Sequence, residues 1–455
     1  MDIATILIVV AGYFLSVSGS CDSSKNRDAT PTSPSDTIPY PNDPDMVILE
    51  FGTGTGGTLT IDGNNFDYPC KTGIRIKNGR YAGITIRNIK STGCPVVIFS
   101  DGQVTLSGTR SAMTLADLNG VVITGDPNYG TAKQFVFENN NYRAVVMQGE
   151  ISNVTLSNMV FRNVADYVIS YDNNLRYTGQ PGSFSENLKL LRMDCERCGQ
   201  FIQFNGSISR NGLTGVYKGI EIAYLTYKDS PAAGNIVYIN NAFDYNIHHN
   251  TVSNVNSANN NHNAMFHLIG NGRFHNNLIN THQGNSIRAW TVSLGSSPQD
   301  VLIYNNIVYN SRKYSAFEVQ GFTAYRVDGQ TTYANAKIFN NTCGSLNTSR
   351  DNFPASVVDV YGLVGGTCEV FNNLGYDFPV RSTHSDIWHP LGDTRISGSN
   401  NLYFDLFSQV GFTDATSFKL NSASAAKNKG KGTLAETDFY GNTRHAANPS
   451  IGAVE

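Results

Sequence analysis

Histidine is concentrated in one part of the chain. Six of the nine histidines fall between residues 248 and 282, at positions 248, 249, 262, 267, 275 and 282. An imidazole titrates near neutral pH, so a histidine can accept or donate a proton during catalysis. His248 and His275 share a repeated position that Tyr304 occupies further on, and we expect them to be stacked rings with a structural role. His267 and His282 fall outside that position and are the better catalytic candidates.

Cationic, acidic and aromatic residues follow the histidines. A cation that neutralises a substrate carboxylate makes the neighbouring proton more acidic, and a nearby base can then remove it. This is the chemistry of β-elimination in a uronic-acid polymer, although solvated surface charges would explain the same residues. The predicted catalytic residues are His267, His282, Arg288, Lys313 and Glu318, and the predicted substrate-binding residues are Trp290 and Tyr314. Arg288 would hold the carboxylate, Lys313 or His282 would take the proton, and Trp290 or Tyr314 would stack on a sugar ring.

An internal repeat sets the spacing of these residues. A short run of apolar and aromatic residues recurs around an anchoring Asn at positions 250, 277, 306, 341, 373 and 401. The anchors are 27, 29, 35, 32 and 28 residues apart, and a period of about 20–50 residues indicates a solenoid. β-Branched and aromatic residues favour strands, so each repeat is one coil of a parallel β-helix. We expect the Asn residues from 250 to 373 to lie in one row along its axis.

The same register predicts the position of the candidate site. Arg288 lies 11 residues after its anchor and Glu318 lies 12 after its own, so the two should be near neighbours. Polar stretches at about 206–216, 256–264 and 321–336 exceed what a turn needs, and insertions into solenoid coils emerge as loops that can wall a groove. The solenoid is expected to span 46–401, and residues 402–455, which lose the repeat, are expected to cap its last coil.

Composition excludes some partners and leaves the metal open. The net charge of −3 gives no argument for a nucleic-acid partner. The 15% of charged residues and the 43 glycines suit a β-rich secreted protein. No cofactor motif stands out. Calcium would suit the many carboxylate and amide oxygens, but no ligand spacing identifies a site.

The cysteines predict disulfide bonds. Cys70 and Cys94 occupy the same place in coils 24 residues apart, and adjacent strands bring Cα atoms within the range that a disulfide requires. Cys195 and Cys198 are predicted to form a local structural disulfide rather than a redox or zinc element. Once Cys21 is set aside, six cysteines remain for disulfides, the other two being Cys343 and Cys368. The pairing of the last four cysteines in the sequence is open.

The N-terminal segment predicts export. Residues 3–17 are apolar and are followed by Ser18-Gly19-Ser20 and Cys21, a length typical of a signal peptide and too short for a membrane span. The segment resembles a bacterial lipoprotein signal. That resemblance implies a signal peptide over 1–20, a lipid on Cys21, and a location at the outer membrane or cell surface after secretion across the inner membrane. Residues 21–45, rich in Ser, Asp and Pro, would be a flexible tether.

The end of the chain carries a second resemblance. Its segments Asp438-Phe439-Tyr440-Gly441-Asn442-Thr443-Arg444 and Pro449-Ser450-Ile451-Gly452-Ala453-Val454-Glu455 resemble the ending of many secreted proteins of the right-handed parallel β-helix, or pectin-lyase-like, superfamily. With the coils, the resemblance covers about residues 46–455. It implies an all-β, right-handed parallel β-helix. The superfamily includes polysaccharide lyases, glycoside hydrolases, epimerases and non-catalytic surface proteins, so the resemblance implies an architecture rather than one activity.

Two functions fit these observations. The first is a cell-surface enzyme that degrades polysaccharide, as a lyase on a uronic-acid-containing glycan rather than a hydrolase, because the cationic and His-rich cluster is clearer than any carboxylate pair. The alternative is a non-catalytic surface protein that binds glycan or adheres through Tyr and Trp side chains. The expected partners are a polysaccharide and, through the lipid anchor, a membrane. Converging titratable groups would favour the enzyme, and a flat aromatic face would favour the binder.

The predicted lipid anchor can be tested directly. Cys21→Ser should move the protein from the membrane fraction to the soluble fraction, because the lipid is attached through the cysteine sulfur. Fractionation and immunoblotting measure the distribution, with Ser23→Ala as the matched control. Unchanged membrane association of Cys21→Ser would refute the anchor.

Overall fold

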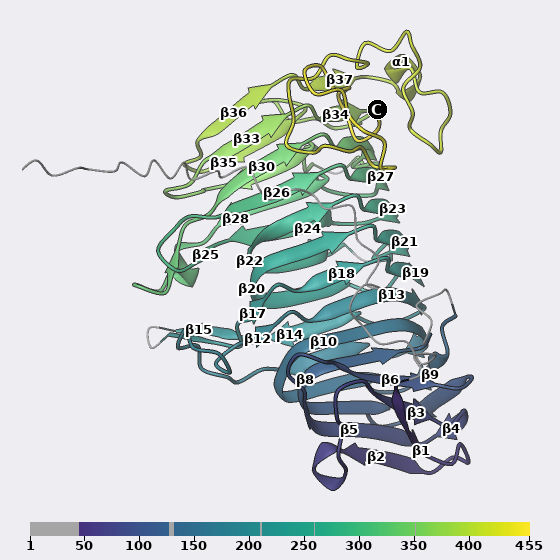
Figure 1. Ribbon diagram of the computed structural model, residues 1–455. Coiled ribbons are helices and arrows are strands. Elements are labelled where there is room, and N and C mark those ends of the chain that lie inside the picture. Colours follow the sequence, from purple (N-terminus) through teal and green to yellow (C-terminus); the bar gives the residue numbers. More distant parts are fainter. Residues whose placement is uncertain (1–44, 127–131, 210–211, 259, 351) are drawn as a thin grey trace, which may run out of the picture.

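The computed structural model describes residues 45–126, 132–209, 212–258, 260–350 and 352–455. These residues form the predicted right-handed parallel β-helix, a solenoid of about 12 turns (Figure 1). The signal peptide, Cys21 and nearly all of the tether lie outside the described residues. Each coil contributes strands to three faces, and residues that occupy the same position in successive coils form a ladder along the axis.

The first face carries the candidate site described below. Its strands pair in parallel from the N-terminal to the C-terminal end of the solenoid. They are β2 (Thr58–Asp62), β5 (Gly83–Lys90), β8 (Met113–Thr124), β10 (Val145–Val164), β11 (Ile169–Asp172), β14 (Ile202–Asn205), β20 (Val237–His248), β22 (Ala264–His275), β24 (Asn285–Thr291), β28 (Phe317–Gly321), β32 (Val358–Tyr361) and β35 (Trp388–Leu391).

The second face shares its longest strands with the first, because β8, β10, β20 and β22 turn a corner of the coil without ending. Its other strands are β1 (Val47–Phe51), β3 (Thr72–Ile76), β6 (Val96–Ser100), β13 (Lys189–Glu196), β18 (Glu221–Ala223), β26 (Asp300–Tyr304), β30 (Asn335–Phe339), β33 (Cys368–Phe371) and β36 (Ile396–Ser399).

The third face includes the later parts of β10 and β13. It also contains β4 (Gly79–Tyr81), β7 (Val104–Gly108), β9 (Phe135–Asn140), β19 (Thr226–Ser230), β21 (Thr251–Val255), β23 (Leu278–His282), β27 (Ile307–Ser311), β31 (Thr342–Leu346), β34 (Leu374–Tyr376) and β37 (Leu402–Phe404).

Several short elements project from the coils or connect their strands. β12 (Ser185–Glu186) pairs with β17 (Tyr217–Lys218). The hairpin of β15 (Ser207–Ser209) and β16 (Gly212–Thr214) is one small antiparallel sheet, and β25 (Ser293–Leu294) and β29 (Thr331–Thr332), from successive coils, form another. Both small sheets project from one side of the solenoid (Figure 1). β15 and β16 fall within the predicted insertion 206–216, and β29 falls within the predicted insertion 321–336. Among the described residues, helix is limited to the short turns η2 (Gly63–Asn65), η3 (Thr323–Tyr325) and α1 (Phe407–Val410). Across the described ranges, no helix has the length and apolarity needed to cross a membrane.

The interior is a continuous apolar core. Along the first face, one inward ladder runs through Leu268, Ala289, Val319 and Val360, all of them buried. Burying a Leu, Ile or Phe side chain stabilises a protein by roughly 1.5–3 kcal/mol. Strand alternation places the neighbouring residues of each strand on the outer surface. The apolar ladders therefore fix which side chains the first face presents to solvent.

The predicted Asn row is confirmed. It follows the corner where the second face ends and the third begins. The side-chain amides of Asn250, Asn277 and Asn306 each donate to Oδ1 of the next anchor, over 2.9–3.0 Å, and the bonds continue through Asn341 and Asn373 to the anchor at 401. The same amide groups also donate to a carbonyl of the preceding coil, as Asn306 does to Phe274 at 3.0 Å. Each coil is therefore held in register by side-chain bonds that duplicate the strand ladder.

The residue before each anchor has a different role. Asn276, Asn305, Asn340, Asn372 and Asn400 all adopt left-handed φ angles of 51–55°, which asparagine tolerates. Their side chains donate to backbone carbonyls of the C-terminal segment, at Asp438, Thr437, Ser450, Lys431 and Lys429 respectively. We expected residues 402–455 to cap the last coil. Instead, residues 402–404 continue the third face as β37, and the following segment runs back along this corner, in yellow in Figure 1.

Removing one anchor should destabilise the whole solenoid. Asn306→Ala would leave the buried amide groups of Asn277 without their acceptor, at on the order of 1–3 kcal/mol for each unsatisfied group. Urea unfolding followed by circular dichroism measures the loss. The control Asn65→Ala, at an exposed position, should change the free energy of unfolding by less than about 0.5 kcal/mol. Equal stability of the two variants would show that the Asn ladder contributes little.

Candidate active site

Polar and titratable side chains occupy one outward ladder of the first face. Opposite one another in successive coils stand Tyr238, His267, Arg288, Glu318, Asp359 and His389. Parallel strands lie about 4.8 Å apart, so each of these residues has its neighbours within reach. The predicted proximity of Arg288 and Glu318 is confirmed, since their Cα atoms are ladder partners.

Glu318 is the buried centre of this ladder. Its side chain is 0% exposed, and its Oε1 accepts a hydrogen bond from Nε of Arg288 at 2.9 Å. Burial raises the pKa of the Glu318 carboxyl, although the charge of Arg288 opposes the shift. Nε2 of His262 lies 3.5 Å from the other carboxylate oxygen. Nη1 of Arg288 also donates to the His262 carbonyl at 3.3 Å, so Arg288 joins the carboxylate to the loop that carries the imidazole.

The protonation of His262 follows from its neighbour. The amide nitrogen of Asn285 donates to the carbonyl of Ser315 at 2.8 Å, which leaves Oδ1 of Asn285 to accept from Nε2 of His262 at 3.0 Å. The proton of a neutral His262 therefore sits on Nε2, and the lone pair on Nδ1. No described residue hydrogen-bonds Nδ1, and the side chain is 31% exposed. Burial and then the charge of Arg288 lower the pKa of His262, so the imidazole is an available base at neutral pH.

A second carboxylate stands beside Glu318. Asp359 accepts a hydrogen bond from Oγ of Ser315 at 2.9 Å and lies 3.6 Å from Nδ1 of His389. Burial raises the pKa of Asp359, and the hydrogen bond to Asp359 raises the pKa of His389. Two carboxyl groups and two imidazoles thus meet on one side of the solenoid.

Aromatic rings surround this cluster. Tyr314 stacks on His262 with ring centroids 3.9 Å apart. Trp290 lies two residues after Arg288 on β24, and the guanidinium carbon of Arg288 is 5.8 Å from its ring. His267 meets Trp290 edge to face at 4.4 Å. Five of the seven residues predicted for catalysis or substrate binding, His267, Arg288, Trp290, Tyr314 and Glu318, therefore belong to one neighbourhood.

Lys313 and His282 differ from this group. Lys313 lies in the bend before β28, next to Tyr314, and its carbonyl accepts a hydrogen bond from Ser311. His282 was predicted to line the groove, and this is wrong. It is 1% exposed, in a ladder between Val255 and Ser311 inside the third face. Thr281 has a φ of 49°, and this left-handed residue breaks the strand alternation and turns His282 into the core.

The sequence analysis missed His262, Asn285, Asp359 and His389 as site residues. Asp359 carried a signal, because it is the single charge in the apolar run Val357-Val358-Asp359-Val360. Counting from the anchor could not find it, since Asp359 lies 18 residues after Asn341, whereas Glu318 lies 12 after Asn306. Insertions of unequal length shift the count from coil to coil.

The predicted Cys70–Cys94 disulfide is confirmed, with Cα atoms 5.2 Å apart. The other predicted disulfides are wrong, because Cys195, Cys198, Cys343 and Cys368 are free and buried. A disulfide between two coils requires that the two cysteines occupy the same ladder position. Cys343 belongs to β31 on the third face and Cys368 to β33 on the second. The Cys195 and Cys198 thiols contact each other through a hydrogen bond, and the Cys198 sulfur also lies 3.5 and 3.6 Å from the carbonyls of Glu196 and Phe161.

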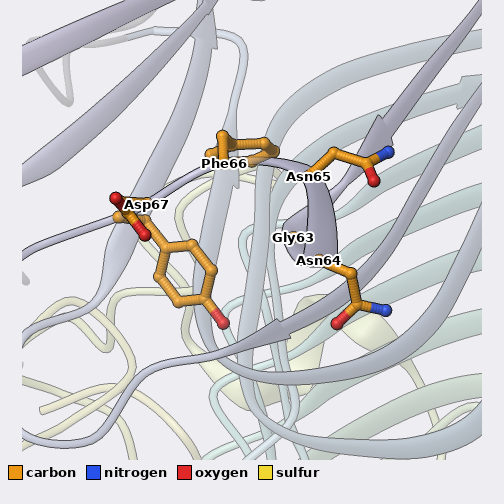
Figure 2. A pocket seen from close by; sticks show the side chains of 6 residues that line it. Gly63, Asn64, Asn65, Phe66 and Asp67 are labelled. Atoms are coloured by element: carbon orange, nitrogen blue, oxygen red, sulfur yellow. The ribbon is translucent and has the colours of Figure 1, made fainter.

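A pocket at the first coil and the acidic and His residues elsewhere in the described chain do not form a second site. Figure 2 shows a pocket at the first coil, lined by Gly63, Asn64, Asn65, Phe66, Asp67 and Tyr68. With one carboxylate and no cation, it lacks the groups that would neutralise and deprotonate a uronate. Among the described residues, no three His, Cys, Asp or Glu side chains are grouped to hold a metal ion. The Arg288 ladder is therefore the candidate site.

Solved structures similar to this chain include three lyases, each of low sequence identity. No protein-family model matches the chain, and no curated protein matches it. A pectate lyase of solved structure is 12% identical, with 89% of this chain and 97% of that chain covered and a TM-score of 0.38. A PL6 family polysaccharide lyase from Pseudopedobacter saltans is 11% identical, with coverages of 79% and 92% and a TM-score of 0.40. An alginate lyase from Paenibacillus sp. is 13% identical, with coverages of 77% and 98% and a TM-score of 0.35.

Burial of His282 predicts a dependence of stability on pH. Burial lowers its pKa from 6.5 to about 3, so the folded protein keeps the ring neutral while the unfolded chain protonates it. Stability should therefore fall as the pH drops from about 6.5 toward 3, by about 1.4 kcal/mol per pH unit for this one proton. His282→Leu removes that share of the slope.

Urea unfolding at a series of pH values measures this slope. The matched control is His445→Leu on the exposed C-terminal segment, which should retain the slope of the unaltered protein. An unaltered slope in a folded His282→Leu variant would contradict the assignment.

Proposed function

We propose that this protein is a cell-surface enzyme that degrades polysaccharide, and that it is a lyase acting on a uronic-acid-containing glycan. The observation that carries the proposal is the neutral imidazole of His262, with an accessible Nδ1, held beside the guanidinium of Arg288. Elimination needs these two groups together: a cation for the substrate carboxylate and a base for the proton next to it.

Arg288 is suited to hold the carboxylate. Glu318 and the His262 carbonyl engage Nε and Nη1, which fixes the plane of the guanidinium. No described residue hydrogen-bonds Nη2, and the side chain is 19% exposed. A substrate carboxylate bound at Nη2 would lie on the same side of the first face as His262.

The reaction would proceed by removal of the proton at C5 of the uronate. Nδ1 of His262 takes that proton, the bond from C4 to the glycosidic oxygen breaks, and a double bond forms between C4 and C5. The departing oxygen requires a proton in return. Tyr361, two residues beyond Asp359, can supply it, because burial raises its pKa to about 12 and keeps the phenol protonated. In this proposal His262 takes the role that the sequence assigned to Lys313 or His282.

A glycoside hydrolase is the second candidate, favoured by the pairing of Glu318 with Asp359. Both carboxyl groups have a pKa raised by burial, and a protonated carboxyl beside an ionised one is the arrangement that glycoside hydrolysis uses. The burial of Glu318, which is 0% exposed, makes it harder for a substrate to reach than His262. The two reactions also differ in product, since only elimination leaves an unsaturated sugar.

The test is turnover of uronate polymers by the purified protein. Alginate, polygalacturonate and glycosaminoglycans would be offered separately, and the absorbance of the unsaturated product would be followed. His262→Ala should lower turnover by about 10²–10⁴-fold, as loss of a general base does. Arg288→Ala should raise KM and also lower kcat, because the guanidinium both holds the carboxylate and makes the neighbouring proton more acidic. The control His445→Ala removes an exposed imidazole outside the cluster and should leave the rate unchanged.

Three outcomes would change the assignment. Reducing ends released without an unsaturated product would favour the hydrolase. Full turnover by a folded His262→Ala variant would refute the role of His262. Binding of a glycan without any bond cleavage would leave a non-catalytic surface binder.

A further inference from the structure

A group of aromatic rings extends from the candidate site toward the insertion that follows β28. Trp290 is its centre. Its ring lies 4.3 Å from that of Phe322 and 5.7 Å from that of Tyr325. On the other side it meets His267, which in turn contacts Tyr238 edge to face at 4.9 Å. We call these five residues the aromatic platform.

The platform is built from separate parts of the chain. Tyr238, His267 and Trp290 come from β20, β22 and β24, in three successive coils of the first face. Phe322 and Tyr325 come from the insertion that begins after β28 and leads to β29, which pairs with β25 of the preceding coil. In Figure 1 this small sheet projects beside β24 and β28. The insertion therefore brings two rings over a sheet face that already carries three.

The platform has no charge at neutral pH. Burial lowers the pKa of His267 to about 3, with Arg288 adding to the shift, so the imidazole is neutral. Burial also raises the pKa of Tyr238 and of Tyr325, so both phenols keep their protons. A carboxylated sugar would find no counter-ion here, whereas Arg288 stands at one edge of the platform.

One ring nitrogen of the platform lacks a hydrogen-bond partner. Nε2 of His267 is buried, and no described residue bonds to it. The indole nitrogen of Trp290, by contrast, faces the carboxylate of Glu318. The whole His267 residue is 6% exposed. A buried polar group without a partner costs roughly 1–3 kcal/mol, and folded proteins leave few such groups unpaired. A ligand that carries a hydroxyl group could satisfy the His267 nitrogen.

We propose that the aromatic platform is a subsite for an uncharged sugar residue. Rings that stack on the apolar face of a sugar, together with an unpaired ring nitrogen that meets one of its hydroxyls, fit a neutral pyranose. Trp290 lies two residues from Arg288 on one strand, about 7 Å away along the strand, so this sugar would adjoin the uronate held at Arg288. The inference rests on the proposed function for that neighbour. It adds that the substrate is a mixed glycan of uronic and neutral sugars.

Binding to the platform can be measured without catalysis. The chain has two tryptophans, Trp290 and Trp388, so Trp388→Phe leaves Trp290 as the single indole. In a His262→Ala background, its fluorescence would be titrated with neutral oligosaccharides of glucose, galactose, mannose and N-acetylglucosamine. We expect a saturable change with at least one of them. Tyr325→Ala should weaken binding about tenfold, from the loss of one stacked ring, whereas the exposed control Tyr440→Ala should not.

Kinetics provide the second measurement. Tyr325→Ala should raise KM about tenfold for a polymer that mixes uronic and neutral sugars, with little change in kcat. It should leave KM for a polymer of uronate alone unchanged. Difference spectra between the unaltered protein and Trp290→Phe would report the same binding should Trp388→Phe fail to fold.

The outcomes separate this inference from the proposed function. If no neutral oligosaccharide changes the fluorescence of Trp290, the subsite is overturned. It is also overturned if the protein shows elimination activity and Tyr325→Ala leaves KM for the mixed polymer unchanged. Fluorescence binding without any elimination product would overturn the lyase and support the subsite.

Discussion

The hydrogen bonds between successive Asn anchors are the constraint on which the rest of the structure depends. A strand that slips by one residue turns its whole buried face outward, and the coils contain loops of unequal length that could absorb such a slip. The anchors prevent it. Asn277 accepts from Asn250 and donates to Asn306, so each coil from Asn250 to Asn401 takes its register from its neighbour. The ladders of these coils follow from that register, including the outward ladder that aligns Arg288 with Glu318.

The sequence revealed the solenoid because the anchors recur at one corner of six successive coils, from Asn250 to Asn401. It also predicted the contact between Arg288 and Glu318, which lie at nearly equal distances after their anchors. It could not give Asp359 or His389, because the loops before β32 and β35 have other lengths. His282 shows a different limit. A single left-handed residue, Thr281, reverses the direction of the next side chain, and residue types alone do not reveal that conformation.

The candidate site shows how a solenoid can keep buried charges. Transferring a lone carboxylate from water into the interior is very costly, so a buried carboxylate needs partners. Glu318 obtains them from the coil before, through Arg288, and from the loop that carries His262. Asp359 obtains Ser315 and His389 from the coils on either side of it. The close spacing of coils therefore supplies each carboxylate with polar neighbours, which lower its pKa and oppose the larger upward shift that burial causes.

The C-terminal segment also restricts how this fold can change length. Coils of a solenoid are in principle interchangeable units, and repeat proteins gain or lose them. Here one segment bonds to the corner residues of five successive coils, from Asn276 to Asn400. It therefore fixes the number and spacing of the coils in that part of the solenoid. Deleting one of these coils would shift every later corner against the segment. The corner residues Arg192, Tyr224 and His249 share the left-handed geometry. They belong to coils that precede those bonded to the C-terminal segment. Duplication or loss of whole coils should therefore be tolerated in the first half of the molecule and resisted in the second.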